Sequence, residues 1–96
     1  MILTQSGDEL TVKLGERLDS GNVAEAEAAL KEVLPWKGTV VWDLEKLEYI
    51  SSAGLRVMLA CQKQMKGNGN MVILHTNDSV MNIFKMTGMA MIFDFQ

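Results

Sequence analysis

Apolar and polar positions follow two different periods along this chain, and each period predicts a different element. Residues 10–14 alternate apolar and polar side chains at period two, which is the pattern of a half-buried strand. Residues 39–44 are instead almost continuously apolar and rich in β-branched side chains, as expected of a central strand. Together with shorter apolar runs, these patterns predict five strands, at residues 2–5, 10–14, 39–44, 71–75 and 91–93.

Three further segments carry their apolar residues at helical spacing. The first follows Asn22, a candidate N-cap with Glu25 three residues later, and it ends before Pro35. The second follows Ser52, which is expected to be its N-cap. The third is expected to stop at Gly88. The predicted helices therefore cover residues 23–34, 53–66 and 79–87.

The predicted elements follow one another in the order β-β-α-β-α-β-α-β. Strands that alternate with helices indicate an α/β fold with a mostly parallel sheet and right-handed crossovers. The 96 residues are expected to form a single domain, 1–96. Residues 15–21 are expected to form a polar loop, and residues 47–51 a connector that turns Tyr49 and Ile50 inward.

Composition and charge exclude several classes of protein. The net charge is −3 and no two basic residues are adjacent, whereas nucleic-acid surfaces cluster positive charge. Direct binding to DNA or RNA is therefore not expected. No apolar run approaches the ~20 residues of a membrane span, and residues 1–5 do not resemble the start of a signal peptide. Cys61 is the only cysteine, which favours a reducing, cytoplasmic location.

Two adjacent hydroxyls, those of Ser51 and Ser52, stand where a connector enters the second predicted helix. The first N–H groups of a helix lack internal partners and attract negative charge, so a phosphate on Ser52 would suit this position. Ala53 and Gly54 are small and would let a partner approach closely. A serine before a helix is nevertheless usually only a cap, worth ~1 kcal/mol, and chemistry alone favours that interpretation.

Other candidate chemistry is weaker. Asp19 and Asp43 could form a carboxylate pair, but a loop cap and a solvated strand end are the favoured interpretation. Ser52 and His75 lack the Gly-x-Ser-x-Gly context of a serine hydrolase. One cysteine, Cys61, and one histidine cannot make a usual zinc site, and no glycine-rich phosphate loop occurs. We therefore expect no catalytic residue, no metal and no cofactor.

Methionine is abundant, with eight residues in the chain. Four of them lie in the C-terminal third, namely Met81, Met86, Met89 and Met91. Adaptable core packing is the favoured role. A protein-contact surface is the alternative for any that are exposed near the third helix.

Taken together, four segments resemble the STAS domain family, in particular the stand-alone anti-sigma factor antagonists of bacteria. They resemble the family's Gly-x-Leu-Asp loop, its central strand ending in Asp-Leu, its Asp-Ser-Ser/Thr/Ala-Gly-Leu phosphorylation loop and its closing helix-and-strand motif. In this chain they are residues 15–19, 40–44, 50–55 and 80–93. The resemblance implies a mixed sheet of four or five strands flanked by helices.

The resemblance also implies a function. An unphosphorylated antagonist of this family binds an anti-sigma factor that is also a serine kinase, and thereby frees the sigma factor. The kinase phosphorylates a loop serine, which matches Ser52, and a metal-dependent serine phosphatase reverses the change. The antagonist itself catalyses nothing. The residues expected to contact the partner are Asp19, Ser51, Ser52, Ala53, Gly54 and Arg56.

Ser51 stands where the family often has aspartate, which leaves Ser51 as the second choice of acceptor. An alternative function within the family is a non-switching accessory subunit of a transporter or lipid-trafficking complex. In that case Ser52 would be only a helix cap.

Overall fold

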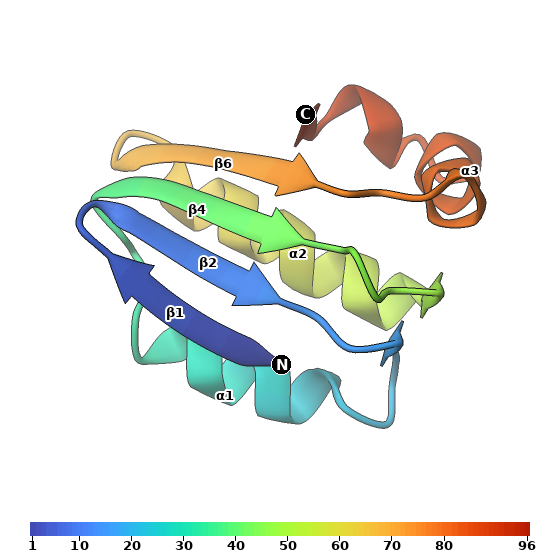
Figure 1. The fold of residues 1–96 in the computed structure, drawn as a ribbon, viewed down its shortest axis with the longest axis horizontal. Helices are drawn as coiled ribbons and strands as arrows, with labels where there is room; N and C mark the ends of the chain where they lie inside the picture. Colours follow the sequence, from blue (N-terminus) through green and yellow to red (C-terminus); the bar gives the residue numbers. More distant parts are fainter.

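An N-terminal hairpin begins the main sheet of this protein, whose computed structural model describes all residues 1–96. The sheet has five strands in the order β1-β2-β4-β6-β7 (Figure 1). Only β1 and β2 pair antiparallel, and every other neighbouring pair is parallel. This confirms the predicted α/β class with a mixed, mostly parallel sheet. The strands are β1 (Ile2–Ser6), β2 (Glu9–Lys13), β4 (Gly38–Asp43), β6 (Gly69–Leu74) and β7 (Asp94–Phe95).

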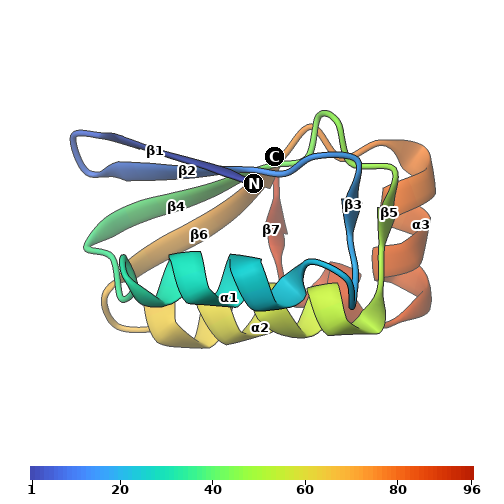
Figure 2. The ribbon, with the colours of Figure 1, turned by 90° about the horizontal axis from the view of Figure 1, so that it is seen from below.

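The core lies between this sheet and two helices, α1 (Val23–Lys31) and α2 (Ser52–Met65), which run side by side on one face of the sheet (Figure 2). Val12, Trp42 and Ile73 are in register across the three central strands, and all are fully buried. These apolar positions are the ones whose pattern predicted the strands. One hydrophobic cluster of 21 buried residues results.

The helix ends differ from the predictions in detail. Asn22 is the N-cap residue of α1, as predicted, but its side chain makes no capping hydrogen bond. That helix ends at Lys31, with Glu32 as C-cap, rather than continuing to Leu34. The third helix, α3 (Asp78–Met86), begins one residue earlier than predicted, because the side chain of Asn77 accepts the backbone N–H of Val80 at 2.8 Å. None of the helices combines the length and apolar character needed to cross a membrane.

A second, two-stranded sheet lies beyond the main one and was not predicted. It pairs β3 (Arg17–Leu18) with β5 (Tyr49–Ile50) in parallel. Each strand has only two residues, so neither can show a period in the sequence. Ile50 is buried as predicted, but Tyr49 is 40% exposed, and its predicted inward orientation is wrong.

The C-terminal segment also departs from the prediction. Residues 91–93 are not a strand. A 3₁₀ helix, η1 (Met89–Met91), is followed by β7, which pairs with β6. The ring of Phe93 packs edge-on against that of Phe84, with 5.8 Å between centroids, so its apolar character reflects core packing rather than strand pairing. As predicted, α3 stops before Gly88, whose backbone is left-handed with a φ of 78°.

Candidate functional site

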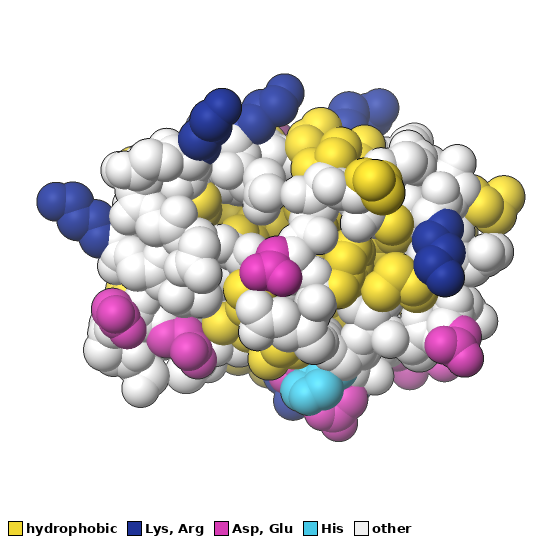
Figure 3. All heavy atoms as spheres, turned by 90° about the horizontal axis from the view of Figure 1, so that it is seen from above, with side chains coloured by type: hydrophobic (Ala, Val, Ile, Leu, Met, Phe, Trp, Pro, Cys, Tyr) yellow, Lys and Arg dark blue, Asp and Glu magenta, His cyan; other side chains and the backbone are white.

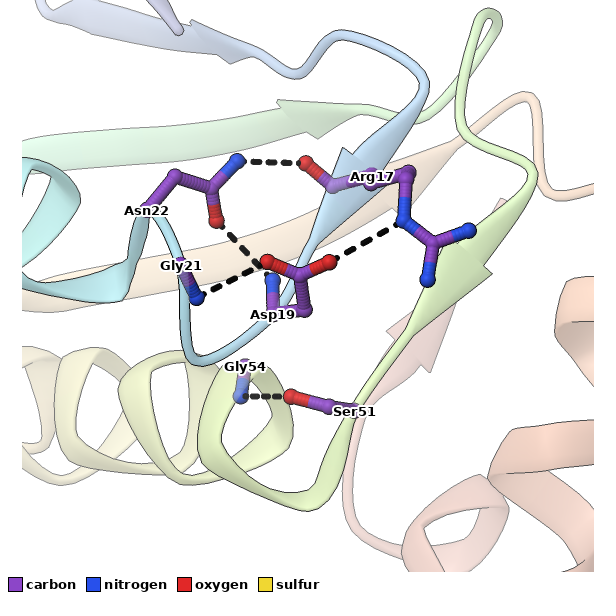
Figure 4. A network of polar contacts seen from close by, with 6 residues as sticks. All are labelled: Arg17, Asp19, Gly21, Asn22, Ser51 and Gly54. Atoms are coloured by element: carbon purple, nitrogen blue, oxygen red, sulfur yellow. Dashed lines mark hydrogen bonds and ion pairs between the residues drawn. The ribbon is translucent and has the colours of Figure 1, made fainter.

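The first turn of α2 separates the roles of two adjacent serines. Ser51 is the N-cap residue, and its Oγ accepts the backbone N–H of Gly54 at 3.3 Å (Figure 4). Ser52 is already the first helical residue, so its predicted role as N-cap is wrong. The cause lies in β5, because the N–H of Ser51 donates to the carbonyl of Leu18 at 2.9 Å. Ser51 is thereby held extended at the end of the strand, and the helix starts one residue earlier than predicted.

The hydroxyl of Ser52 is therefore uncommitted. The residue is exposed, and its side chain makes no hydrogen bond within the chain. Ala53 beside it is half-buried, and Gly54 is buried. An exposed hydroxyl that makes no hydrogen bond is accessible to a kinase. The hydroxyl of Ser51 is less accessible, because Ser51 is half-buried and its Oγ accepts the N–H of Gly54.

Gly54 fixes the position of this helix entrance. A Cβ atom built on it would lie 2.7 Å from the carbonyl oxygen of Leu18 and 2.8 Å from Cγ1 of Ile50. Both distances are too short for any side chain. The glycine thus allows the first turn of α2 to pack directly on the small β3–β5 sheet.

Asp19 follows β3, and Figure 4 shows its carboxylate directed toward Arg17 and Gly21. Its Oδ2 accepts a hydrogen bond from Nε of Arg17 at 3.0 Å, and its Oδ1 accepts the backbone N–H of Gly21 at 3.0 Å. These two hydrogen bonds, the one from Arg17 first, hold the pKa of Asp19 below its ordinary value. The carboxylate is therefore ionised at neutral pH.

Arg17 and Asn22 also belong to this surface, although the sequence indicated Asn22 only as a helix cap and did not indicate Arg17. The guanidinium of Arg17 lies over the ring of Tyr49, 4.7 Å from its centroid. The side chain of Asn22 ties the loop together, since its Nδ2 donates to the carbonyl of Arg17 and its Oδ1 accepts the N–H of Asp19. The pairing of β3 with β5 brings Arg17 beside Tyr49, and no sequence signal predicts that pairing.

Arg56 lies one turn further along α2 and is exposed. It borders a groove of about 440 Å³ between α1 and α2, whose floor includes Leu30, Val57 and Cys61. Burial raises the pKa of Cys61 to about 11. The thiol in this groove is therefore unreactive near neutral pH.

The lone histidine serves a different part of the molecule. Nδ1 of His75 lies 2.9 Å from Oδ1 of Asp43, at the carboxyl ends of β6 and β4. Figure 3 shows this histidine at the lower edge of the face, beside acidic side chains. Ser52 makes no bond to it, and Asp19 and Asp43 have separate partners. The structure therefore assembles neither a Ser–His hydrolase nor the carboxylate pair.

Asp43, Glu45 and His75 place three ligand atoms within 4.8 Å of one another. The group is exposed or half-buried, and such acidic groups are common on protein surfaces without an ion. We therefore do not assign a metal site to these three residues.

Hydrophobic side chains gather on the same face over α3 and the C-terminal residues (Figure 3). Met86 is 78% exposed and Met91 is 92% exposed, so these two are not core residues. Met81 and Met89 pack against the core. The favoured role of core packing thus holds for two of these four methionines and not for the other two.

The fold and the helix entrance together define a class of protein, a small α/β module with a minor two-stranded sheet beside an exposed serine. The STAS domain family model matches residues 1–96 of the chain. Among curated proteins, it is 38% identical over 78 residues to a Bordetella bronchiseptica protein with the provisional name anti-sigma factor antagonist BtrV. That match covers 79% of this chain and 67% of BtrV.

Solved structures share the fold. The anti-sigma factor antagonist SpoIIAA in its unphosphorylated form superposes with a TM-score of 0.82, at 18% identity, over 99% of this chain and 86% of that one. The phosphorylated form of SpoIIAA from Bacillus gives 0.75 at 17% identity, over 99% and 89%. A STAS domain protein from Planctomyces limnophilus gives 0.87 at 15% identity, over 98% and 86%. The chain belongs to the STAS domain family.

Proposed function

We propose that this protein is an anti-sigma factor antagonist whose binding to its anti-sigma factor is switched by phosphorylation of Ser52. The observation that supports this most directly is the exposed, uncommitted hydroxyl of Ser52 beside the capping hydroxyl of Ser51. The relationship to BtrV and the shared fold of SpoIIAA, known in unphosphorylated and phosphorylated forms, support the same function.

The unmodified surface suits close contact with a protein. Ser52 and Ala53 present small side chains, so a partner can approach the backbone of the first turn of α2. Asp19 and Arg56 offer one charge of each sign for pairing with the partner. The contact surface proposed is that of Asp19, Ser51, Ser52, Ala53, Gly54 and Arg56.

Phosphorylation opposes this contact through charge. A phosphate adds about −1.5 to −2 charges at neutral pH. At a tight interface it would have to be desolvated, and burying an uncompensated charge is strongly unfavourable. The complex is therefore expected to dissociate.

The partners in this proposal are an anti-sigma factor that is also a serine kinase and a serine phosphatase. The kinase transfers the γ-phosphoryl group of ATP to Oγ of Ser52, and the hydroxyl proton passes to a base of the kinase. The phosphatase hydrolyses the phosphate ester with water, which restores the hydroxyl of Ser52 and releases inorganic phosphate. This protein supplies the acceptor and no catalytic group, and it acts in the cytoplasm, where ATP is available.

Intact mass spectrometry tests the acceptor. The purified protein is incubated with ATP and the anti-sigma kinase encoded in the same genome, and its mass should rise by one phosphate. The Ser52→Ala variant should show no rise, whereas Ser51→Ala should still be modified. Modification of Ser52→Ala would move the site to Ser51. No modification, with partner binding unchanged in Ser52→Asp, would instead indicate a non-switching accessory subunit.

A further inference from the structure

Ser52 and Arg56 lie four residues apart on α2, which is helical from Ser52 to Met65. Side chains at this spacing are neighbours on successive turns, with about 5–6 Å between their Cβ atoms. Both residues are exposed, so both side chains can move toward each other without displacing the core.

Arg56 has no competing partner within its own helix. The sequence of α2 contains neither aspartate nor glutamate, and the two ion pairs of the chain, Arg17–Asp19 and Asp43–His75, lie elsewhere. Across the groove, α1 presents Glu27 and Lys31, and neither lies within 4.0 Å of an opposite charge on α2. The guanidinium is thus available to any anion that arises one turn away.

The cap of this helix is also neutral. Ser51 uses a hydroxyl to accept the N–H of Gly54, where the family often has an aspartate. An aspartate there would place a carboxylate next to any phosphate on Ser52 and repel it. In this chain no acidic residue occupies the first turn of α2, and the carboxylate of Asp19 is already paired with Arg17 at 3.0 Å. Arg56 is therefore the charged side chain of α2 nearest in sequence to a phosphate on Ser52.

We infer that Arg56 binds the phosphate of phosphorylated Ser52 within the same helix, and that phosphorylation thereby withdraws Arg56 from the partner surface. Guanidinium and phosphate groups form charge-assisted, often bidentate, hydrogen bonds. The unmodified protein keeps Arg56 free for an acidic group of the partner. Phosphorylation then removes a favourable charge from the interface and adds an unfavourable one. This inference rests on the proposed function of Ser52.

The titration of the phosphate tests this pairing without any kinase. Phosphoserine is incorporated at position 52 during synthesis, and its ³¹P NMR signal is followed against pH. The second ionisation of a free phosphoserine has a pKa of about 6. Pairing with Arg56 favours the dianion, so Arg56→Gln should raise the midpoint by about 0.3 pH units or more, the equivalent of one i,i+4 ion pair.

Lys63→Gln is the matched control, since it removes one positive charge from the same helix. Lys63 lies eleven residues from Ser52, about 16 Å along the helix axis, and its removal should leave the midpoint unchanged. A purely structural role of Arg56 would move neither midpoint. Equal midpoints in the unaltered phosphoprotein and in Arg56→Gln would overturn the inference.

Binding completes the test. In the unphosphorylated protein, Arg56→Gln should weaken binding to the anti-sigma kinase several-fold, and Lys63→Gln should not. Unchanged affinity in Arg56→Gln would overturn the claim that Arg56 serves the partner. The two proposals fail separately, because a kinase that never modifies Ser52 would refute the proposed function and leave the phosphate titration intact.

Discussion

The hydroxyl of Ser51 accepts the backbone N–H of Gly54 at 3.3 Å, and this bond leaves the neighbouring hydroxyl of Ser52 free. Two serines that are equivalent in sequence terms thus differ in structure. One stabilises the helix and the other is available for modification. Their substitutions are expected to have opposite consequences for stability and for phosphorylation.

The first prediction concerns the stability of these two variants. Ser51→Ala should lower the free energy of unfolding by about 1 kcal/mol, because the N–H of Gly54 loses its cap. Ser52→Ala should change it by less than about 0.5 kcal/mol, as for an exposed residue without partners. Urea unfolding of both variants checks this. A larger loss in Ser52→Ala than in Ser51→Ala would reverse the assignment of the cap.

Gly54→Ala tests the close approach of α2 to β3. In a helix interior, alanine is normally more stable than glycine by about 1 kcal/mol. Here its Cβ would lie 2.7 Å from the carbonyl oxygen of Leu18, a backbone atom that cannot move aside easily. Such overpacking typically costs about 1–3 kcal/mol. We therefore expect a net loss of stability in thermal or urea unfolding.

Ala60→Gly provides the comparison for that substitution, because Ala60 is exposed on the same helix. It should destabilise by about 1 kcal/mol through helix propensity alone. If Gly54→Ala stabilised the protein by a similar amount, the packing of the helix entrance described above would be incorrect.

Asp43 predicts a dependence of stability on pH. Partial burial raises the pKa of Asp43. Hydrogen bonds from His75 and from the N–H of Glu45, together with the charges of His75 and Lys13, lower this pKa by more than burial raises it. Its net pKa in the folded protein lies below the ordinary value of 3.8. A carboxyl of this kind stabilises the fold above its unfolded pKa, and the contribution is lost as the pH falls through its folded pKa.

Asp43→Asn should accordingly lower the free energy of unfolding at neutral pH by up to about 1 kcal/mol, the range of a partly exposed ion pair. The difference from the unaltered protein should shrink as the pH falls below about 4. Urea unfolding at both pH values measures it. Glu48→Gln, which removes an exposed carboxylate without an ion pair, should show no such trend. A difference that stayed constant with pH would contradict the role of the Asp43–His75 contact.

Cys61 predicts slow thiol chemistry in the folded protein. Its pKa is raised from 9.0 to about 11, a change of two units, so at about pH 8 the thiolate fraction falls roughly 100-fold. Reaction with a disulfide reagent should be slower than that of the unfolded chain by at least this factor, because access is also restricted. Equal rates in the folded and unfolded protein would show that the groove between α1 and α2 exposes the sulfur.

Much of the main sheet could be predicted because its strands bury whole rows of apolar side chains. Val12 and Trp42 lie on segments whose patterns alone indicate strands, and Gly88 marks the end of the third helix correctly. The position of Ser51 and Ser52 at the entrance to a helix was also predictable, since a clearly amphipathic segment follows them. In these cases the local pattern and the tertiary contacts favour the same structure.

The parts that could not be predicted depend on contacts between distant segments. The cap passes from Ser52 to Ser51 because β5 pairs with β3, which lies more than thirty residues earlier in the chain. The same pairing brings Arg17 over Tyr49. The exposure of Met86, the last residue of α3, and of Met91, the last residue of η1, could not be predicted, because a methionine suits either environment.

The measurement that tests this account most directly is the affinity of the protein for its anti-sigma kinase, with and without phosphate on Ser52. Isothermal titration calorimetry, with phosphoserine incorporated at position 52, gives both values under the same conditions. We expect tight binding of the unmodified protein and a loss of at least about 100-fold on phosphorylation, equivalent to about 2.8 kcal/mol. Equal affinities would contradict the switch.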